Sequence, residues 1–222
     1  MIEYLLKFTT KQEYANQLLK GQLFMHPASF YWGLEKGQGD LYEAAVSPIS
    51  QIYKNPNFAI YCFSHVDDNN IEDGKIEIDK KLVDDCAKNG FVTIIDYKKF
   101  EDILFRSDFG GYRLLKDKVE YKKFGLYDIP ILLDSNENIQ LFIKNPSFSY
   151  QKEYRLVVTY AIDDIFETKI RNGSSYLQRV DSGNKTFYLQ DNLYSIAKTI
   201  TISELERNKA GNYLLSIPQE LL

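Results

Sequence analysis

The chain has 222 residues, of which 44% are hydrophobic and 14% aromatic. This composition is enough for one large domain with its own core, and it argues against global disorder. The formal net charge of -4 argues against an evenly basic surface for nucleic acid, although Lys116, Lys118, Lys122 and Lys123 are clustered closely enough to form a local basic groove.

The cysteine content and the apolar runs indicate where the protein resides. Cys62 and Cys86 show no metal-ligand spacing, so reduced thiols in a cytosolic protein are expected. The opening "MIEYLLKFTT" has Glu3 where a signal peptide carries positive charge, and no stretch approaches the roughly 18 apolar residues of a membrane-spanning helix. We therefore expect a cytoplasmic protein that does not cross a membrane.

Strands outnumber helices in the predicted order of elements. A helix over residues 11–20 is predicted by a capping box of Thr10 and Glu13, with Gly21 as its left-handed cap. Asp79 and Asp96 are expected to cap two further helices. Another short helix is predicted near residues 137–145, and a last one is predicted from Ser203 and Glu206. Strands are expected at residues 3–8, 22–26, 58–64, 75–78, 91–97, 118–124, 153–160, 186–190 and 197–203.

The remaining segments read as loops, and the order of elements indicates the fold class. Residues 28–57 carry several Gly and Pro, and residues 171–184 form a polar run. No internal repeat or low-complexity linker is visible, and strands and helices do not alternate regularly. We predict a single α+β domain over residues 1–222, with a mixed, mostly antiparallel sheet and peripheral helices.

The strand candidate "EYRLVVTY" begins with a charged residue, Glu153. Because alternate residues of a strand share a face, Glu153 and Arg155 point one way, while Tyr154 and Leu156 point toward the expected core. From these residues alone, a solvated strand entrance is the better interpretation, with Glu153 paired to Arg155 or Lys152. A catalytic carboxylate at the mouth of a cleft is the alternative.

Several catalytic signatures are absent from the sequence. It has no phosphate-binding glycine loop of standard spacing, no Gly-x-Ser-x-Gly elbow and no paired-cysteine zinc motif. Of the two histidines, His26 beside Pro27 reads as a packing residue, whereas His65 ends a strand where it could face a cleft.

Acidic residues leave a metal-dependent nuclease open as a further interpretation. The residues available for a metal are Asp40, Glu43, Asp67 and Asp68. The acidic run that starts at Asp67 reads better as a solvated turn, and no metal site is predicted.

The order of short motifs resembles that of a widespread bacterial family, which is classified as a domain of unknown function. The motifs are "LLKGQLFMHPASF", "GDLYEA", "IYCFS", "VEY", "SYQKEYRLVV" and "AKTITIS". They touch most of the chain. The segment "HVDDNNIEDG" stands where the family has a tryptophan-containing one.

The same architecture resembles, more distantly, ADP-ribosyltransferases, including toxins that modify nucleic acids. The resemblance implies NAD as substrate, a catalytic glutamate at the start of a late strand, a basic first-strand residue and a supporting hydroxyl. It points to Glu153 and Ser64 as catalytic, and to Lys7, Phe8, Thr9, Phe30, Tyr31, Tyr42 and Arg155 as NAD-binding. Lys7 stands where histidine or arginine is more usual, and plain packing is the alternative role for the aromatic residues.

Two functions from different classes follow. The first is an ADP-ribosyltransferase-like enzyme that consumes NAD and modifies a macromolecule, nucleic acid or protein, as a toxin or a factor in conflict between phage and bacterium. The second is a non-catalytic domain that holds a nucleotide or a protein in a Tyr-rich cleft.

Overall fold

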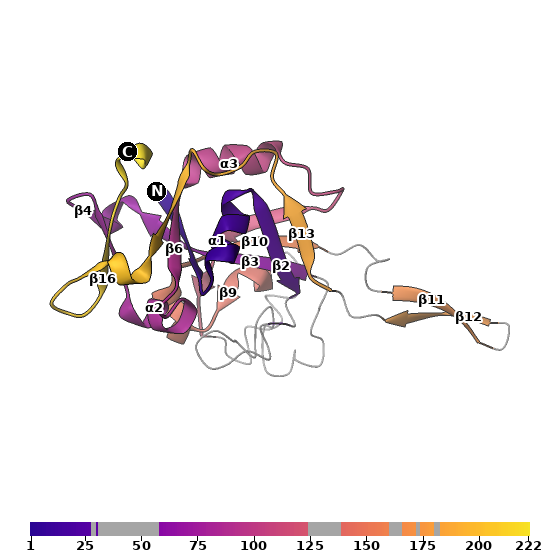
Figure 1. Ribbon diagram of the computed structural model, residues 1–222. Helices are drawn as coiled ribbons and strands as arrows, with labels where there is room; N and C mark the ends of the chain where they lie inside the picture. The colour runs from indigo at the N-terminus through magenta and orange to yellow at the C-terminus, as the bar shows by residue number, and fades with distance from the viewer. Residues whose placement is uncertain (28–29, 31–57, 124–138, 160–165, 172–173, 180–182) are drawn as a thin grey trace.

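The structure is a computed structural model (Figure 1). It describes residues 1–27, 30, 58–123, 139–159, 166–171, 174–179 and 183–222.

A largely antiparallel sheet of eight strands forms the centre of the described structure. Six strands follow one another across it, and β10 extends it by pairing with both β3 and β7. This confirms the predicted α+β class with a mostly antiparallel sheet. In spatial order the six are β13 (Lys185–Tyr188), β2 (Gln22–Pro27), β3 (Phe58–Asp67), β1 (Ile2–Thr9), β6 (Phe91–Asp96) and β14 (Ala197–Thr201); the other two are β10 (Glu153–Thr159) and β7 (Leu114–Lys118).

Strand β3 is the branch point of the sheet. One edge pairs with β10 from Phe58 to Ser64. The other edge is shared, because β1 pairs with β3 at Ser64 and beyond, while β2 pairs with it at Ala59 and Ile60. β1 and β2 therefore separate beside Cys62, and this separation determines where the side chain of Lys7 can reach.

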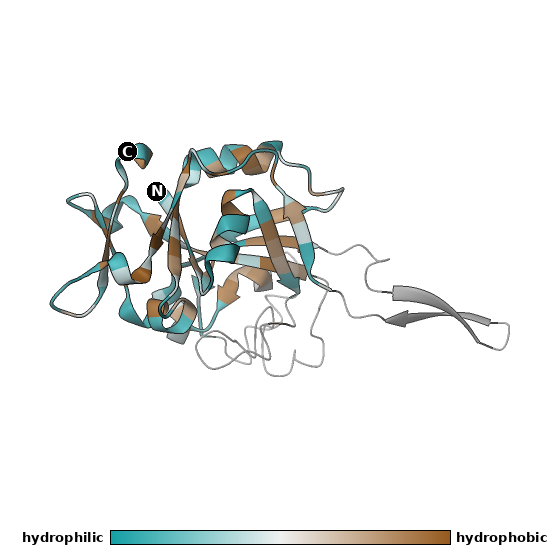
Figure 2. Ribbon diagram, in the orientation of Figure 1, coloured by the Kyte–Doolittle hydropathy of each residue, from teal (hydrophilic) through white to brown (hydrophobic). Residues whose placement is uncertain are grey.

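Helices cover both faces of the central sheet (Figure 1). On one face, α1 (Gln12–Leu19) and α3 (Tyr97–Arg106) bury Leu18 and Phe100 against strand residues such as Leu5. On the other face, α2 (Lys80–Cys86) buries Val83 beside Leu6. Apolar residues accordingly concentrate on the central strands and on the helix sides that meet them (Figure 2).

Smaller elements surround this core. A four-stranded sheet packs on the α2 side, and a two-stranded hairpin and a short parallel pair complete the strands of the described residues. They are β15 (Glu206–Arg207), β16 (Tyr213–Ser216), β5 (Lys75–Ile78) and β4 (Ile71–Glu72) in the four-stranded sheet, β11 (Phe166–Arg171) with β12 (Ser174–Arg179), and β8 (Glu120–Tyr121) with β9 (Ile143–Lys144). The 3₁₀ helices are η3 (Asp68–Asn70), η4 (Ile139–Phe142), η5 (Pro146–Gln151), η7 (Ile202–Glu204) and η8 (Gln219–Leu221).

Two of the three predicted caps at the starts of α1, α2 and α3 are present in the structure. Asp79 and Asp96 cap α2 and α3, as predicted, by accepting hydrogen bonds from backbone amides. The expected capping box at Thr10 is wrong, because α1 begins after Lys11 without a side-chain cap.

Two further expectations near the carboxyl end of the chain are corrected. The helix expected from Ser203 is wrong: the reciprocal cap falls two residues earlier, where the amide of Thr201 donates to Glu204 at the start of η7. The polar run over residues 171–184 is not entirely a loop, because Ser174–Arg179 pairs with β11 as a strand. Among the described residues, none of the helices has both the length and the apolar character needed to span a bilayer.

Candidate functional site

Glu153 opens β10 at a sharp change of backbone direction. Lys152, directly before it, ends η5 in the left-handed region at φ 42°, ψ 53°. From Glu153 onward the chain pairs with β3, and from Tyr154 with β7. Both faces of β10 are buried, and Glu153 is only 4% exposed. The interpretation of Glu153 as a solvated strand entrance is therefore wrong, because neighbouring segments cover the face that was expected to meet water.

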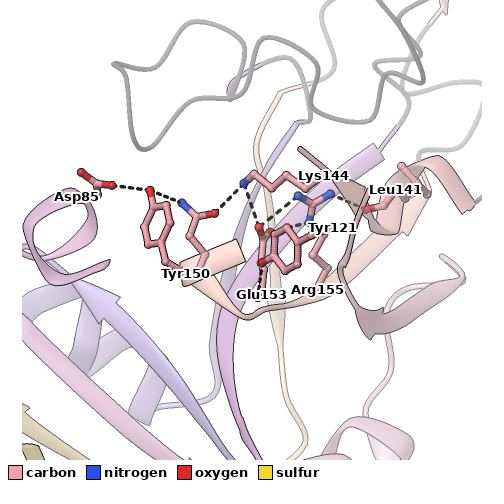
Figure 3. Close-up of polar contacts among 8 residues, drawn as sticks. Asp85, Tyr121, Leu141, Lys144, Tyr150, Glu153 and Arg155 are labelled. Atoms are coloured by element: carbon pink, nitrogen blue, oxygen red, sulfur yellow. Dashed lines mark hydrogen bonds and ion pairs between the residues drawn. The ribbon is translucent and has the colours of Figure 1, made fainter. Parts of the chain in front are cut away.

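Two cations bind the buried carboxylate of Glu153 (Figure 3). Arg155 Nε donates to Oε1 at 2.6 Å and Nη2 donates to Oε2 at 3.3 Å. Lys144 Nζ donates to Oε2 at 3.0 Å. The third donor of Arg155, Nη1, reaches the backbone carbonyl of Leu141 at 2.5 Å. The predicted pair of Glu153 with Arg155 is thus present, and Lys144 rather than Lys152 is the second partner.

A chain of hydrogen bonds leads from this ion cluster to α2 (Figure 3). Lys144 also donates to Gln151 Oε1 at 3.0 Å, and Gln151 contacts the hydroxyl of Tyr150 at 3.5 Å. Tyr150 donates in turn to Asp85 at 2.5 Å. Buried polar groups need such partners, because an unpaired one loses its hydration without replacement.

The charge state of Glu153 follows from these neighbours. Burial alone raises the pKa of a carboxyl group. Here the charges of Arg155 and Lys144, with hydrogen bonds from Arg155 and the Cys62 side chain, outweigh burial and hold the pKa of Glu153 well below its usual range. The group is an anion at neutral pH. It is therefore suited to stabilising positive charge rather than to donating a proton.

Ser64 lies directly across from Glu153 in the ladder between β3 and β10. Its neighbour on the other side is Leu6 of β1, so it occupies the strand between the first-strand residues and the glutamate. Cys62 is opposite Arg155 in the same ladder. The alternation of strand side chains places Ser64 and Cys62 on the face that carries Glu153.

Lys7, Phe8 and Thr9, the predicted first-strand residues, do not share one face. Lys7 Nζ donates to the Cys62 carbonyl at 2.7 Å and lies over the ring of Tyr61. Burial lowers the pKa of Lys7, and Cys62, Cys86 and Glu153 partly oppose this shift. Phe8 packs on the α2 side instead. Thr9 Oγ1 is buried and has no hydrogen-bond partner within the described structure.

Of the predicted aromatic residues Phe30, Tyr31 and Tyr42, Phe30 is the one that the structure describes, and it does not lie at Glu153. Phe30 is 41% exposed and stacks on His26, with ring centroids 3.9 Å apart. His26 pairs with Ile60, so this stack lies toward the far end of β3 from Ser64. Tyr31 and Tyr42 lie outside the described residues.

A cavity of about 700 Å³ opens beside Ser64. Its wall includes Ser64, His65, Tyr150 and Lys152, together with residues of β4, β5 and β16 in the four-stranded sheet. Lys7 and Glu153 do not line it. Carboxylates outnumber cations along the wall. The charged residues of the lining are Glu72, Asp73, Glu77, Asp79, Lys75 and Lys152. The volume is within the range of small-molecule pockets, and the charge favours a ligand that is not strongly anionic.

His65 contributes to the cavity wall, but it is opposite Leu5 in the ladder with β1, so alternation along β3 directs its side chain to the other face from Ser64. Burial lowers the pKa of His65 to about 4, Lys118 adds to the shift, and Asp67 opposes it. Asp67 lies 3.3 Å from Nδ1, yet the ring is neutral at pH 7, so the contact is not an ion pair there. Nδ1 has no hydrogen-bond partner within the described residues.

Three of the four lysines of the predicted basic groove are engaged in ion pairs. Lys116 pairs with Glu101, Lys118 with Asp67, and Lys122 with Glu120. Asp67 is thereby engaged, and Asp68 pairs with the N-terminal amine; Asp40 and Glu43 lie outside the described residues. No cluster of three or more potential metal ligands occurs in the part of the chain that the structure describes.

Sequence reasoning missed Lys144, Tyr121 and Gln151. Tyr121 accepts a hydrogen bond from the Glu153 amide at 2.8 Å, which fixes the start of β10. No spacing rule links these positions to Glu153, because they come from a short parallel strand pair and a 3₁₀ turn. A buried carboxylate needs cationic partners, but the sequence does not indicate which lysine supplies one.

Comparisons with protein-family models, with curated proteins and with solved structures found no match to this chain.

Proposed function

We propose that the protein is an ADP-ribosyltransferase-like enzyme that consumes NAD, with Glu153 as its catalytic carboxylate. One observation carries the proposal: the first-strand Lys7, the hydroxyl of Ser64 and Glu153 come from β1, β3 and β10, which are neighbours in the sheet, and Ser64 lies directly opposite Glu153. These are residue types that the resemblance implied: Ser64 shares a face of the sheet with Glu153, whereas Lys7 lies over the ring of Tyr61 on the other face.

The charge of Glu153 supports the chemistry. In the proposed step the bond between nicotinamide and C1′ of the ribose breaks, and its electron pair stays on the nicotinamide nitrogen. Positive charge develops on the ribose, and an anionic carboxylate stabilises it while accepting a hydrogen bond from a ribose hydroxyl. The acceptor then bonds to C1′ and releases its proton to solvent. The lowered pKa of Glu153 keeps the carboxylate in the required form.

The other residues have defined roles in this proposal. Ser64 supports the carboxylate from the facing strand, and Lys7 binds the pyrophosphate or the adenylate-side ribose. Arg155, which is fully buried and bound to Glu153, acts as a positioning residue. The target is a macromolecule, as expected for a toxin or a conflict factor.

The test is nicotinamide release from NAD, followed with the purified protein alone and with cell lysate or nucleic acid added. We expect release and label transfer by the wild type, loss in Glu153→Gln and a marked reduction in Ser64→Ala. Glu220→Gln, which breaks an exposed pair with Lys198, is the matched control and should retain the wild-type rate. Folding of each variant is checked by circular dichroism. Absence of nicotinamide release from the wild type under all three conditions contradicts the enzyme.

The cavity beside Ser64 favours a second candidate, a non-catalytic ligand-binding protein. Its acidic wall suits a neutral or cationic polar compound better than a dinucleotide. Ligand binding raises the melting temperature by mass action, so a thermal-shift screen separates the two candidates. A compound that stabilises the protein without being turned over, together with no effect of NAD, supports the binder. Stabilisation by NAD with release of nicotinamide contradicts it.

A further inference from the structure

Residues 141–151 form a covering segment over Glu153. Lys144, on this segment, contacts the carboxylate of Glu153 directly, and the Leu141 carbonyl accepts from Arg155 (Figure 3). Glu153 and Arg155 are 4% and 0% exposed. A ligand from solvent therefore does not reach the Glu153 carboxylate while this segment is in place.

The covering segment has few regular attachments to the rest of the fold. β9 is two residues long, and it pairs with β8, also of two residues. The six residues of η5 form a 3₁₀ helix, which has poorer hydrogen-bond geometry than an α-helix. By contrast, β10 itself is paired along its whole length with β3. Segments with few ladder bonds open at lower free energy than central strands.

A strained residue joins the covering segment to β10. Lys152 has φ 42°, and the other described non-glycine residues with positive φ are Asp73 and Asn89. Asp and Asn adopt the left-handed region readily, whereas it is unfavourable for lysine. Lys152 lies at the end of η5, the kind of position where a hinge residue absorbs a change in φ and ψ.

The cavity borders the covering segment at the same place. Tyr150 and Lys152 form part of its wall, and Ser64, opposite Glu153, forms another part. Displacing the segment would thus extend the cavity to the Glu153 carboxylate. The contacts that resist this displacement include Lys144 with Glu153 and Tyr150 with Asp85.

We propose that the covering segment is a lid that turns at Lys152, and that the Lys144–Glu153 ion pair latches it in an autoinhibited, closed state. The consequence for turnover rests on the proposed function, because the lid hides the proposed catalytic carboxylate. A ligand that binds Glu153 in the open state shifts the population toward opening by its differential affinity.

Hydrogen–deuterium exchange, read by mass spectrometry on the full chain, tests the lid without reference to activity. In Lys144→Met we expect amides of residues 141–151 to exchange about tenfold faster or more, because a hydrogen bond to a charged group is lost. Peptides from β1 and β6 should stay much better protected than residues 141–151. Lys144→Arg should stay close to wild type. Lys198→Met, which removes an exposed 3.0 Å pair with Glu220, is the matched control.

Unchanged exchange in residues 141–151 of Lys144→Met overturns the latch. Exchange in residues 141–151 that is as slow as in β1 and β6 also overturns it, because the segment then opens only when the whole fold unfolds. Nicotinamide release gives the separate readout for function, and we expect it to be faster in Lys144→Met than in the wild type. Local opening without nicotinamide release from either protein contradicts the proposed enzyme but still supports the lid. Local opening with unchanged or slower nicotinamide release overturns the autoinhibition.

Discussion

The ion cluster at Glu153 gives the most quantitative prediction. Replacing Glu153 by glutamine keeps the size of the side chain but removes its charge, and it leaves Arg155 and Lys144 buried without their shared anion. Breaking a buried pair in this way costs about 3–5 kcal/mol. For a chain of this length, each kcal/mol shifts the melting temperature by roughly 2–4 °C, so we expect a decrease of about 6–20 °C.

Differential scanning calorimetry of wild type and Glu153→Gln measures this decrease. Glu220→Gln is the control, because the Lys198–Glu220 pair has the same 3.0 Å separation as Lys144–Glu153 but Glu220 is 56% exposed. Its melting temperature should be almost unchanged, since solvent screens exposed pairs. Equal decreases in the melting temperatures of the two variants, or no decrease in Glu153→Gln, would show that burial does not make this ion cluster important for stability.

The pH dependence of the same pair has a definite sign. The pKa of Glu153 is lowered on folding, so its contribution to stability is present above the unfolded value of about 4.3 and is lost as pH falls below that toward the folded pKa. The stability difference between wild type and Glu153→Gln should therefore be constant near neutral pH and shrink in acid. A difference that grows below pH 4 contradicts the assignment.

Three further predictions concern stability. Because burial lowers the pKa of His65 to about 4, stability should fall as pH decreases from about 6.5 to 4, and His65→Gln should flatten this slope in urea titrations; an unchanged slope contradicts it. A Cβ at Gly90 would lie 2.2 Å from the Thr9 carbonyl oxygen, so Gly90→Ala should lower the free energy of unfolding, measured by chemical denaturation, by about 1–3 kcal/mol or more. Gly183→Ala, which places its Cβ in open space, should leave it unchanged, and similar losses in the two variants would contradict the steric clash. At Lys152, the β-branched substitution Lys152→Val should lower the melting temperature and speed exchange in residues 141–151, while Lys152→Asn should preserve both; equal behaviour of the two variants contradicts a left-handed hinge.

Local sequence signals predicted much of the fold. Apolar runs with β-branched residues identified β3, β6 and β10, and Asp79 and Asp96 indicated where α2 and α3 begin. The capping box at Thr10 failed although its residue spacing is correct, because the helix begins one residue later. A cap is decided by backbone geometry over a few residues, which the spacing alone does not determine.

The site was predictable in its strand positions but not in its environment. The start of a strand at Glu153 and the end of an apolar run at Ser64 are visible in the sequence, and the sheet places them opposite one another. The burial of the Glu153 face is not visible, because it depends on a segment whose short strand and 3₁₀ turns have no periodic pattern. Lys144 therefore became recognisable as a partner only from its position in space.

We have proposed that Glu153 is the catalytic carboxylate of an NAD-consuming enzyme. Nicotinamide release from NAD, measured by chromatography for wild type, Glu153→Gln and Ser64→Ala below the melting temperature of the least stable variant, tests it most directly. We expect release by the wild type in the presence of its macromolecular target, none by Glu153→Gln and reduced release by Ser64→Ala. Equal release by wild type and a folded Glu153→Gln would contradict it.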